Sequence, residues 1–291
     1  MGKDSSAILT IALIAASALS GADASPKALG KLLTFHAAFD GGMDARFGLG
    51  DKRIYTAASY KEQDAAKPGI DGTDVELARG AGRFGDALRF KKKNTKAIFF
   101  RAEKNVTYTP ANWTGTVSFW LNLNPDQDLE PGFCDPIQVT DKAYNDSAIW
   151  VDFTKDDKPR HMRLGVFGDL KAWNPKNLAS DANQDFVRRL VVVSKPPFER
   201  GKWTHIAISF SGLGGGKGWA KLYLDAQLQG TAENIGEPFA WDLARAALRL
   251  GVNYTGLFDD LAVFNRPLSG AEVKTLHGLN KGVAGISRAA H

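Results

Sequence analysis

The chain has 291 residues, of which 44% are hydrophobic and 24% are charged, and its formal net charge is +5 at pH 7. This balance is typical of a folded globular protein and excludes a disordered or collagen-like chain. The single cysteine, Cys134, excludes an internal disulfide framework. The modest positive charge fits either solubility or attraction to an anionic polymer, and we find no nucleic-acid-binding motif beside it.

The first 24 residues have the pattern of a secretory signal peptide. Lys3 gives a positive start, residues 7–19 form an apolar stretch, and residues 22–24 form an Ala-x-Ala cleavage pattern. The apolar stretch is shorter than a membrane-spanning helix needs. We therefore expect residues 1–24 to be removed. The mature chain, without a membrane span, would be secreted, periplasmic or displayed at the cell surface.

Strand patterns begin at residues 33–39 and continue along most of the chain. Residues 40–86 are rich in Gly, Asp and Lys and show little periodicity, so we expect a long loop that carries short β pieces. The later strand candidates are short apolar or alternating runs bounded by turn residues. They are 87–90, 97–101, 116–123, 137–140, 148–153, 162–167, 187–193, 203–210, 220–224, 248–252 and 257–264. Many short strands without helical patterns between them predict an all-β, antiparallel two-sheet sandwich.

One helix is expected near the end of the chain. Pro267 ends the last strand because proline cannot donate a hydrogen bond to a sheet ladder. Ser269 followed by Glu272 is the signature of a capping box at a helix start. The sequence therefore predicts a short helix over residues 269–279, followed by a flexible tail at residues 281–291.

Six segments along the chain form an ordered set of motifs. They are residues 39–41, 82–90, 115–121, 201–207, 222–225 and 256–276, the last reading GLFDDLAVFNRPLSGAEVKTL. Together they resemble the laminin G-like and concanavalin A-like jelly-roll family, whose domains end in an Asp-Asp strand, an Asn-Arg turn and a short helix. The resemblance implies one jelly-roll domain, which we place at residues 30–280.

Ala226 departs from the family pattern, which usually has glycine at this hairpin tip. A two-residue type I′ turn would place Ala226 at positive φ, where a Cβ brings strain. This favours a longer hairpin or another turn type.

Alternation along three strands assigns side chains to a common surface. In residues 116–123, 148–153 and 162–167, apolar residues at alternate positions face the core, and the others face away. If these strands belong to the concave sheet, one groove is lined by Trp120, Trp150, Asp152, His161 and Arg163. Such a mixture suits a sugar, because rings stack on its apolar face while polar groups hold its hydroxyls.

Each tryptophan in this set has a structural alternative. Trp120 and Trp150 could instead be covered by loops. Trp173 lies in the polar loop 170–186, where it would be either a platform for the ligand or an anchor for the loop.

No catalytic motif stands out in the sequence. Hydrolases of the laminarinase type resemble one another through a Glu-x-Asp-x-x-Glu strand, which places the nucleophile and the acid on one face. That pattern is missing here, as are a nucleophile elbow, a zinc-protease helix and a phosphate loop. His161 and Arg163 on one face would suit proton abstraction beside a uronate, but spacing identifies no Tyr or Gln partner.

We therefore expect a secreted, non-catalytic carbohydrate-binding or adhesion module. Its partner would be a glycan or polysaccharide, acidic ones included. Two alternatives stay open: a polysaccharide hydrolase or lyase with a non-obvious site, and an envelope or matrix structural protein.

Asp259 is unusual in the last strand. In strict alternation it shares a face with Leu257, Leu261 and Val263, so its carboxylate would need a partner within an apolar row. The family resemblance places this strand beside the end of the first strand, where Asp40 lies. A structural calcium ion bound by Asp40 and Asp259 would satisfy both carboxylates. The alternative is that Asp259 accepts hydrogen bonds from loop amides.

Overall fold

The computed structural model describes residues 24–286 except residues 73, 181 and 182. Residues 1–23 of the predicted signal peptide and residues 287–291 of the predicted tail therefore lie outside the described residues. Within the described residues, no helix is both long enough and apolar enough to cross a membrane.

The described chain is built mainly around two sheets of antiparallel strands. One sheet has nine: β1 (Leu33–Ala37), β2 (Phe47–Gly48), β5 (Val75–Ala78), β6 (Ala87–Phe90), β8 (Trp113–Asn122), β13 (Thr204–Leu213), β14 (Gly218–Leu224), β15 (Gln227–Ile235) and β17 (Gly256–Phe264). The other has eight: β3 (Ile54–Ala57), β4 (Lys67–Pro68), β7 (Ala97–Arg101), β9 (Cys134–Thr140), β10 (Ala148–Phe153), β11 (Met162–Phe167), β12 (Leu190–Val193) and β16 (Ala247–Val252). The helices are short: α1 (Pro26–Leu32), η1 (Tyr60–Ala65), α2 (Pro125–Asp128), α3 (Leu170–Trp173), α4 (Gln184–Val187), α5 (Gly270–His277) and η3 (Val283–Gly285).

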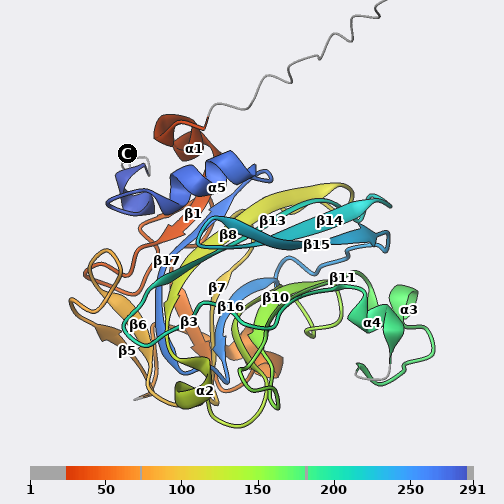
Figure 1. The fold of residues 1–291 in the computed structure, drawn as a ribbon, viewed down its shortest axis with the longest axis horizontal. Helices are drawn as coiled ribbons and strands as arrows, with labels where there is room; N and C mark the ends of the chain where they lie inside the picture. Colours follow the sequence, from red (N-terminus) through yellow and green to blue (C-terminus); the bar gives the residue numbers. More distant parts are fainter. Residues whose placement is uncertain (1–23, 73, 181–182, 287–291) are drawn as a thin grey trace, which may run out of the picture.

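The two sheets form the layers of a sandwich, as the sequence predicts (Figure 1). The first runs β15-β14-β13-β8-β17-β1-β2, with β6 paired to β17 and β5 to β6; the second runs β12-β11-β10-β9-β16-β7-β3-β4. Strands β10 and β11 have the predicted alternation. Their core-facing side chains are Ile149, Val151, Phe153, Met162, Leu164 and Val166. Trp150 and Asp152 consequently point to the outer face of the eight-stranded sheet.

Helix α5 confirms the predicted capping box and lies on the outer face of the nine-stranded sheet (Figure 1). Glu272 N donates to Ser269 Oγ at 3.3 Å, and Ser269 N donates back to Glu272 Oε2 at 2.9 Å. Val273 and Leu276 of α5 pack with Leu29 of α1 in one apolar cluster. This outer layer covers part of the sheet and leaves the rest open.

The hairpin between β14 and β15 is a two-residue turn. Leu224 pairs with Gln227, and the turn residues Asp225 and Ala226 have φ values of 46° and 63°. Positive φ at both central positions is the type I′ pattern, so the expectation of a longer or different hairpin was wrong. The backbone N–H of His205 donates to Asp225 Oδ1 at 2.9 Å, which holds the strained turn in place.

A β-bulge in β17 changes the face on which Asp259 lies. Asp259 pairs with Trp120, the register shifts after it, and Asp260 has a φ of 51°. The core-facing side chains of this strand are Phe258, Leu261 and Val263. The expectation that Asp259 shares a face with Leu261 and Val263 was therefore wrong, because the extra residue of the bulge reverses the alternation.

Candidate functional site

A pocket of about 430 Å³ opens on the outer face of the eight-stranded sheet. Its floor is built from cross-strand neighbours: Trp150 of β10 pairs with Gln138 of β9, and Asp152 of β10 pairs with Arg163 of β11. The remaining lining residues are Phe133, Asp135, Tyr144, Ser180, Phe186, Val252 and Asn253. The pocket therefore combines aromatic walls with a polar floor.

Trp150 supports the pocket from below. Its indole stacks on Phe167, with ring centroids 5.9 Å apart and planes at 12°, and lies over Gly165 of the neighbouring strand. Trp150 Nε1 donates to the carbonyl oxygen of Tyr144 at 2.6 Å. Trp150 is only 1% exposed, whereas Tyr144 is 42% exposed. The ring that a ligand can reach is thus that of Tyr144, which Trp150 holds in position.

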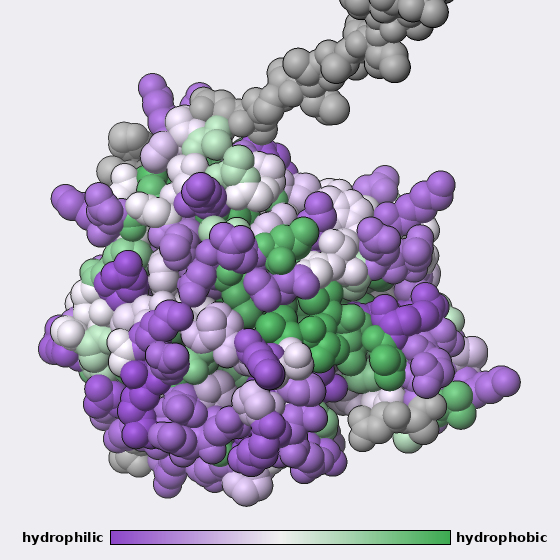
Figure 2. All heavy atoms as spheres, viewed as in Figure 1, coloured by the Kyte–Doolittle hydropathy of each residue, from purple (hydrophilic) through white to green (hydrophobic). Residues whose placement is uncertain are grey.

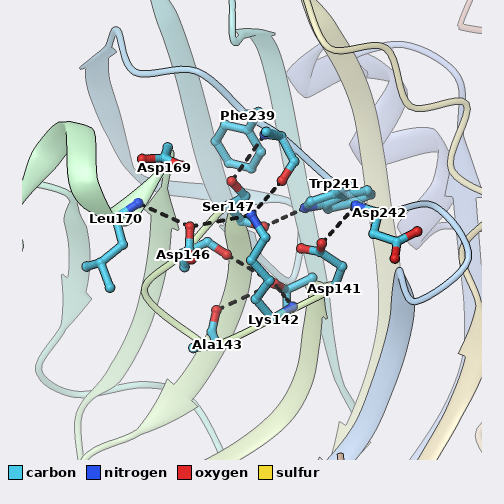
Figure 3. Close-up of polar contacts among 12 residues, drawn as sticks. Asp141, Lys142, Ala143, Asp146, Ser147, Asp169, Leu170, Phe239, Trp241 and Asp242 are labelled. Carbon is cyan, nitrogen blue, oxygen red and sulfur yellow. Dashed lines mark hydrogen bonds and ion pairs between the residues drawn. The ribbon is translucent and has the colours of Figure 1, made fainter. Parts of the chain in front are cut away.

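The loop between β9 and β10, which carries Tyr144, is also fixed on its far side (Figure 3). Trp241 Nε1 donates to the carbonyl oxygen of Ser147 at 2.6 Å, and Asp242 N donates to Asp141 Oδ2 at 2.8 Å. These bonds join the loop to the segment before β16. The rim of the pocket is therefore preformed rather than ordered by a ligand.

A charged pair forms one side of the floor. Arg163 binds both carboxylate oxygens of Asp152, with Nε 2.9 Å from Oδ1. Its guanidinium lies 4.8 Å from the ring of Phe133 and 5.6 Å from that of Trp150. Burial raises the pKa of Asp152, and the hydrogen bonds from Arg163 oppose that rise. The ion pair is thus nearly buried and fixed in orientation.

Asp135 is a second carboxyl group beside Asp152. Burial raises its pKa to about 8, the charge of Asp152 adds to the rise, and Gln138 Nε2 opposes it by donating to Asp135 Oδ2. At neutral pH Asp135 therefore carries a proton while Asp152 is paired with Arg163. Asp135, Gln138 and Tyr144 are pocket residues that were not predicted from the sequence. The signal available for Tyr144 was an aromatic residue within a polar loop between two strands.

The predicted groove forms only in part. Trp150, Asp152 and Arg163 do line one pocket. Trp120 does not, because β8 belongs to the nine-stranded sheet, where Trp120 is 4% exposed. His161 precedes β11 and lies 3.6 Å from Asp157, outside the pocket lining.

Trp173 anchors its loop, which is the structural alternative left open above. It is 3% exposed and packs against Phe167 and Phe186. Its Nε1 donates to the carbonyl oxygen of Asn145 at 2.9 Å. Trp173 thereby ties the α3 segment to the loop that carries Tyr144.

The Asp40 and Asp259 carboxylates accept backbone hydrogen bonds. Asp259 Oδ2 accepts from Arg83 N at 2.7 Å and from Phe84 N at 3.2 Å, and Asp40 Oδ1 accepts from Asp86 N at 3.0 Å. Within the described ranges, no group of three or more His, Cys, Asp or Glu residues could hold a metal. Amide donors of this kind are what the hydrogen-bonded alternative expects for Asp259. Calcium binding stays a prediction.

Comparisons with known proteins identify the family and the fold. A model of the concanavalin A-like lectin/glucanases superfamily matches residues 94–274. No curated protein matches the sequence. The binding domain of botulinum neurotoxin serotype D is 13% identical, with a TM-score of 0.55 over 87% of this chain and 52% of that chain. Trypanosoma rangeli sialidase, in complex with the inhibitor DANA, is 13% identical, with a TM-score of 0.51 over 86% of this chain and 33% of that chain.

Domain 4 of an extracellular arabinanase from Geobacillus stearothermophilus, in complex with arabinotriose, also matches. It is 17% identical, with a TM-score of 0.48 over 83% of this chain and 96% of that chain. This chain covers only 33% of the sialidase chain and 52% of the toxin chain. At such identities the likenesses to the sialidase and to the toxin binding domain concern the fold and leave the ligand open.

Proposed function

We propose a non-catalytic glycan-binding role for this chain, which belongs to the concanavalin A-like lectin/glucanase superfamily. The observation that carries the proposal is the exposed ring of Tyr144 above a preformed pocket with a polar floor. The pocket volume of about 430 Å³ falls within the range of ligand pockets, roughly 300–1,000 Å³.

The pocket offers both kinds of contact that a sugar needs. The ring of Tyr144 gives a flat apolar surface for one face of a pyranose. Gln138 and Asn253 have amide groups that can donate to and accept from hydroxyls, and the Asp152–Arg163 pair adds charged partners. Because Trp150 and its neighbours already hold the rim, binding orders few side chains.

A glycan-cleaving enzyme is the second candidate, and Asp135 favours it. A buried acid that keeps its proton at neutral pH beside a second carboxylate is the combination that glycosidases use. Against it, Arg163 engages both oxygens of Asp152, so the charge of this carboxylate is already neutralised within a nearly buried ion pair. We accordingly place binding before cleavage.

A glycan array followed by calorimetry on the best ligand tests the binding role. Tyr144→Ala should weaken binding about tenfold, whereas Tyr144→Phe, which keeps the ring and loses only the hydroxyl bond to Ser180, should change it little. A reducing-end assay on the same sample tests cleavage. If the wild type releases sugar and Asp135→Asn does not, the chain is a glycan-cleaving enzyme and the non-catalytic binding role is wrong.

The place of action belongs to the same proposal. The signal-peptide pattern at residues 1–24 supports export to the periplasm, the cell surface or the medium, where polysaccharides are available as partners.

A further inference from the structure

A second pocket, of about 400 Å³, lies on the outer face of the other sheet. Its residues come from the loop before β6, from β8, from the segment before β13, from the β14–β15 turn and from the last turn of α5 (Figure 1). The side chains that matter are Arg83, Trp120, Lys202, Trp203, Asp225 and His277. None of them contributes to the pocket that carries Tyr144, which opens on the opposite side of the sandwich.

Trp120 forms the floor and orients two neighbours. The ring of His277 stacks on it at 5.4 Å with planes at 20°, and the guanidinium of Arg83 lies 5.1 Å from its centroid. The backbone of Arg83 is fixed as well, because its N–H donates to Asp259 Oδ2 at 2.7 Å. Arg83 is therefore an exposed cation with a constrained position.

Positive charge dominates the pocket. Arg83 contacts aromatic rings, and Lys202 Nζ donates to the carbonyl oxygen of Pro197 at 3.3 Å. In the part of the chain that the structure describes, neither makes an ion pair with a carboxylate. Asp225 is the acidic residue of the lining, and it is engaged by the N–H of His205 and by His277 at 3.8 Å.

We propose that this pocket binds an anionic sugar residue, a pyranose that carries a carboxylate or a sulfate group. An Arg fork and a Lys ammonium recognise such an anion by charge-assisted hydrogen bonds. Trp203 is half-buried at the edge of the pocket and presents a ring against which a pyranose can pack. Binding of the anion here requires no ligand in the Tyr144 pocket, whose residues are all different.

The test is calorimetry and NMR of the tryptophan indole N–H groups with matched ligands on the full mature chain. Trigalacturonate supplies the carboxylate, its methyl ester keeps the shape without the charge, and galactose 6-sulfate supplies the alternative anion. We expect trigalacturonate or galactose 6-sulfate to bind and to shift the Trp203 signal. The ester should bind at least tenfold more weakly than the acid if carboxylate is the recognised group.

Variants locate the site. Arg83→Ala and Lys202→Ala should each weaken binding about tenfold, since both side chains are exposed and their loss leaves the fold intact. Lys217→Ala, which removes the same charge from an exposed loop outside the pocket, should change it less than twofold. A Trp203 signal shift that Arg83→Ala removes and Lys217→Ala keeps separates this site from the Tyr144 pocket. The proposal is overturned if neither anion binds, if ester and acid bind equally while sulfate does not bind, or if Arg83→Ala has no more effect than Lys217→Ala.

Discussion

The fit of Trp150 over Gly165 leads to a sharp prediction about stability. A Cβ built on Gly165 would lie 2.2 Å from Cζ2 and 2.4 Å from Cε2 of Trp150. The indole cannot simply move aside, because it stacks on Phe167 and its Nε1 is bonded to the carbonyl oxygen of Tyr144. Gly165→Ala should therefore overpack the site and destabilise the protein by about 1–3 kcal/mol. For a domain of this size, that lowers the melting temperature by roughly 2–4 °C per kcal/mol.

A matched control and a rescue make this reasoning testable. Gly42→Ala makes the same chemical change where no heavy atom lies within 4 Å of the new Cβ, so it should stay within about 0.5 kcal/mol of the wild type. Combining Gly165→Ala with Trp150→Phe shortens the ring that clashes, so a double-mutant cycle should show a favourable coupling of about 1 kcal/mol. Urea unfolding measures the wild type, Gly165→Ala, Trp150→Phe, their double mutant and the Gly42→Ala control. Equal stability of Gly165→Ala and Gly42→Ala would refute the steric argument.

Three further predictions concern charge, metal and processing. The folded state holds the pKa of Asp135 near 8, above the ordinary carboxyl value of 3.8, so it binds a proton that the unfolded state has lost. Stability should consequently fall as the pH rises from about 4 to about 8, and Asp135→Asn should flatten that fall in urea unfolding at pH 5 and pH 8.5; equal falls in both proteins would contradict this assignment. If calcium binds at Asp40 and Asp259, the melting temperature of the wild type should rise with calcium concentration, and that of Asp259→Asn should not. A wild-type melting temperature that is unchanged after rigorous metal removal would leave Asp259 as a hydrogen-bonded residue without a metal. N-terminal sequencing of the exported protein should begin at Ser25, and a mature chain that starts at Met1 would contradict the signal peptide.

The elements that sequence analysis located best are those whose local signals are complete. Strands β6, β7, β10 and β11 begin and end at the predicted residues, because each is a short apolar or alternating run between turn residues. Helix α5 begins where the capping box places it. In contrast, β15 was missed. It is an edge strand with mostly exposed polar positions, and its pairing with β14 rather than any alternation defines it.

Contacts between the two sheets could not be predicted from single strands either. Figure 2 shows apolar side chains gathered where β15 and β11 approach each other, and hydrophilic side chains over the lower part of this face. Among the described residues, Val192 of β12 and Leu228 of β15 are about half exposed. Gly230 of β15 lies directly against Val191, so the two sheets close on each other at their edge strands. Such contacts depend on how the sheets are stacked, which no single strand encodes.

The bulge in β17 illustrates why face assignments fail where a strand is irregular. In a regular strand, one of the two consecutive residues Asp259 and Asp260 would face the core and the other would face away from it. In the structure Asp260 takes a φ of 51°, and its carboxylate bonds the buried ring of His36 at 2.7 Å. Asp259 instead holds the loop that carries Arg83. Local propensity gives no sign of the extra residue, since the bulge is stabilised by partners more than 170 positions away in the chain.

The same limit explains why Asp135 was not found. The search for paired carboxylates followed single strands, where acid and nucleophile would be two or four residues apart. Here the two carboxyl groups come from adjacent strands, with Asp135 at the start of β9, beyond the predicted bounds of that strand, and Asp152 within β10. Their proximity depends on the register of β9 against β10, which shifts between Val151 and Phe153. Chemistry built across strands is set by register and bulges, so periodicity along the chain can identify the outward-facing residues but cannot pair them.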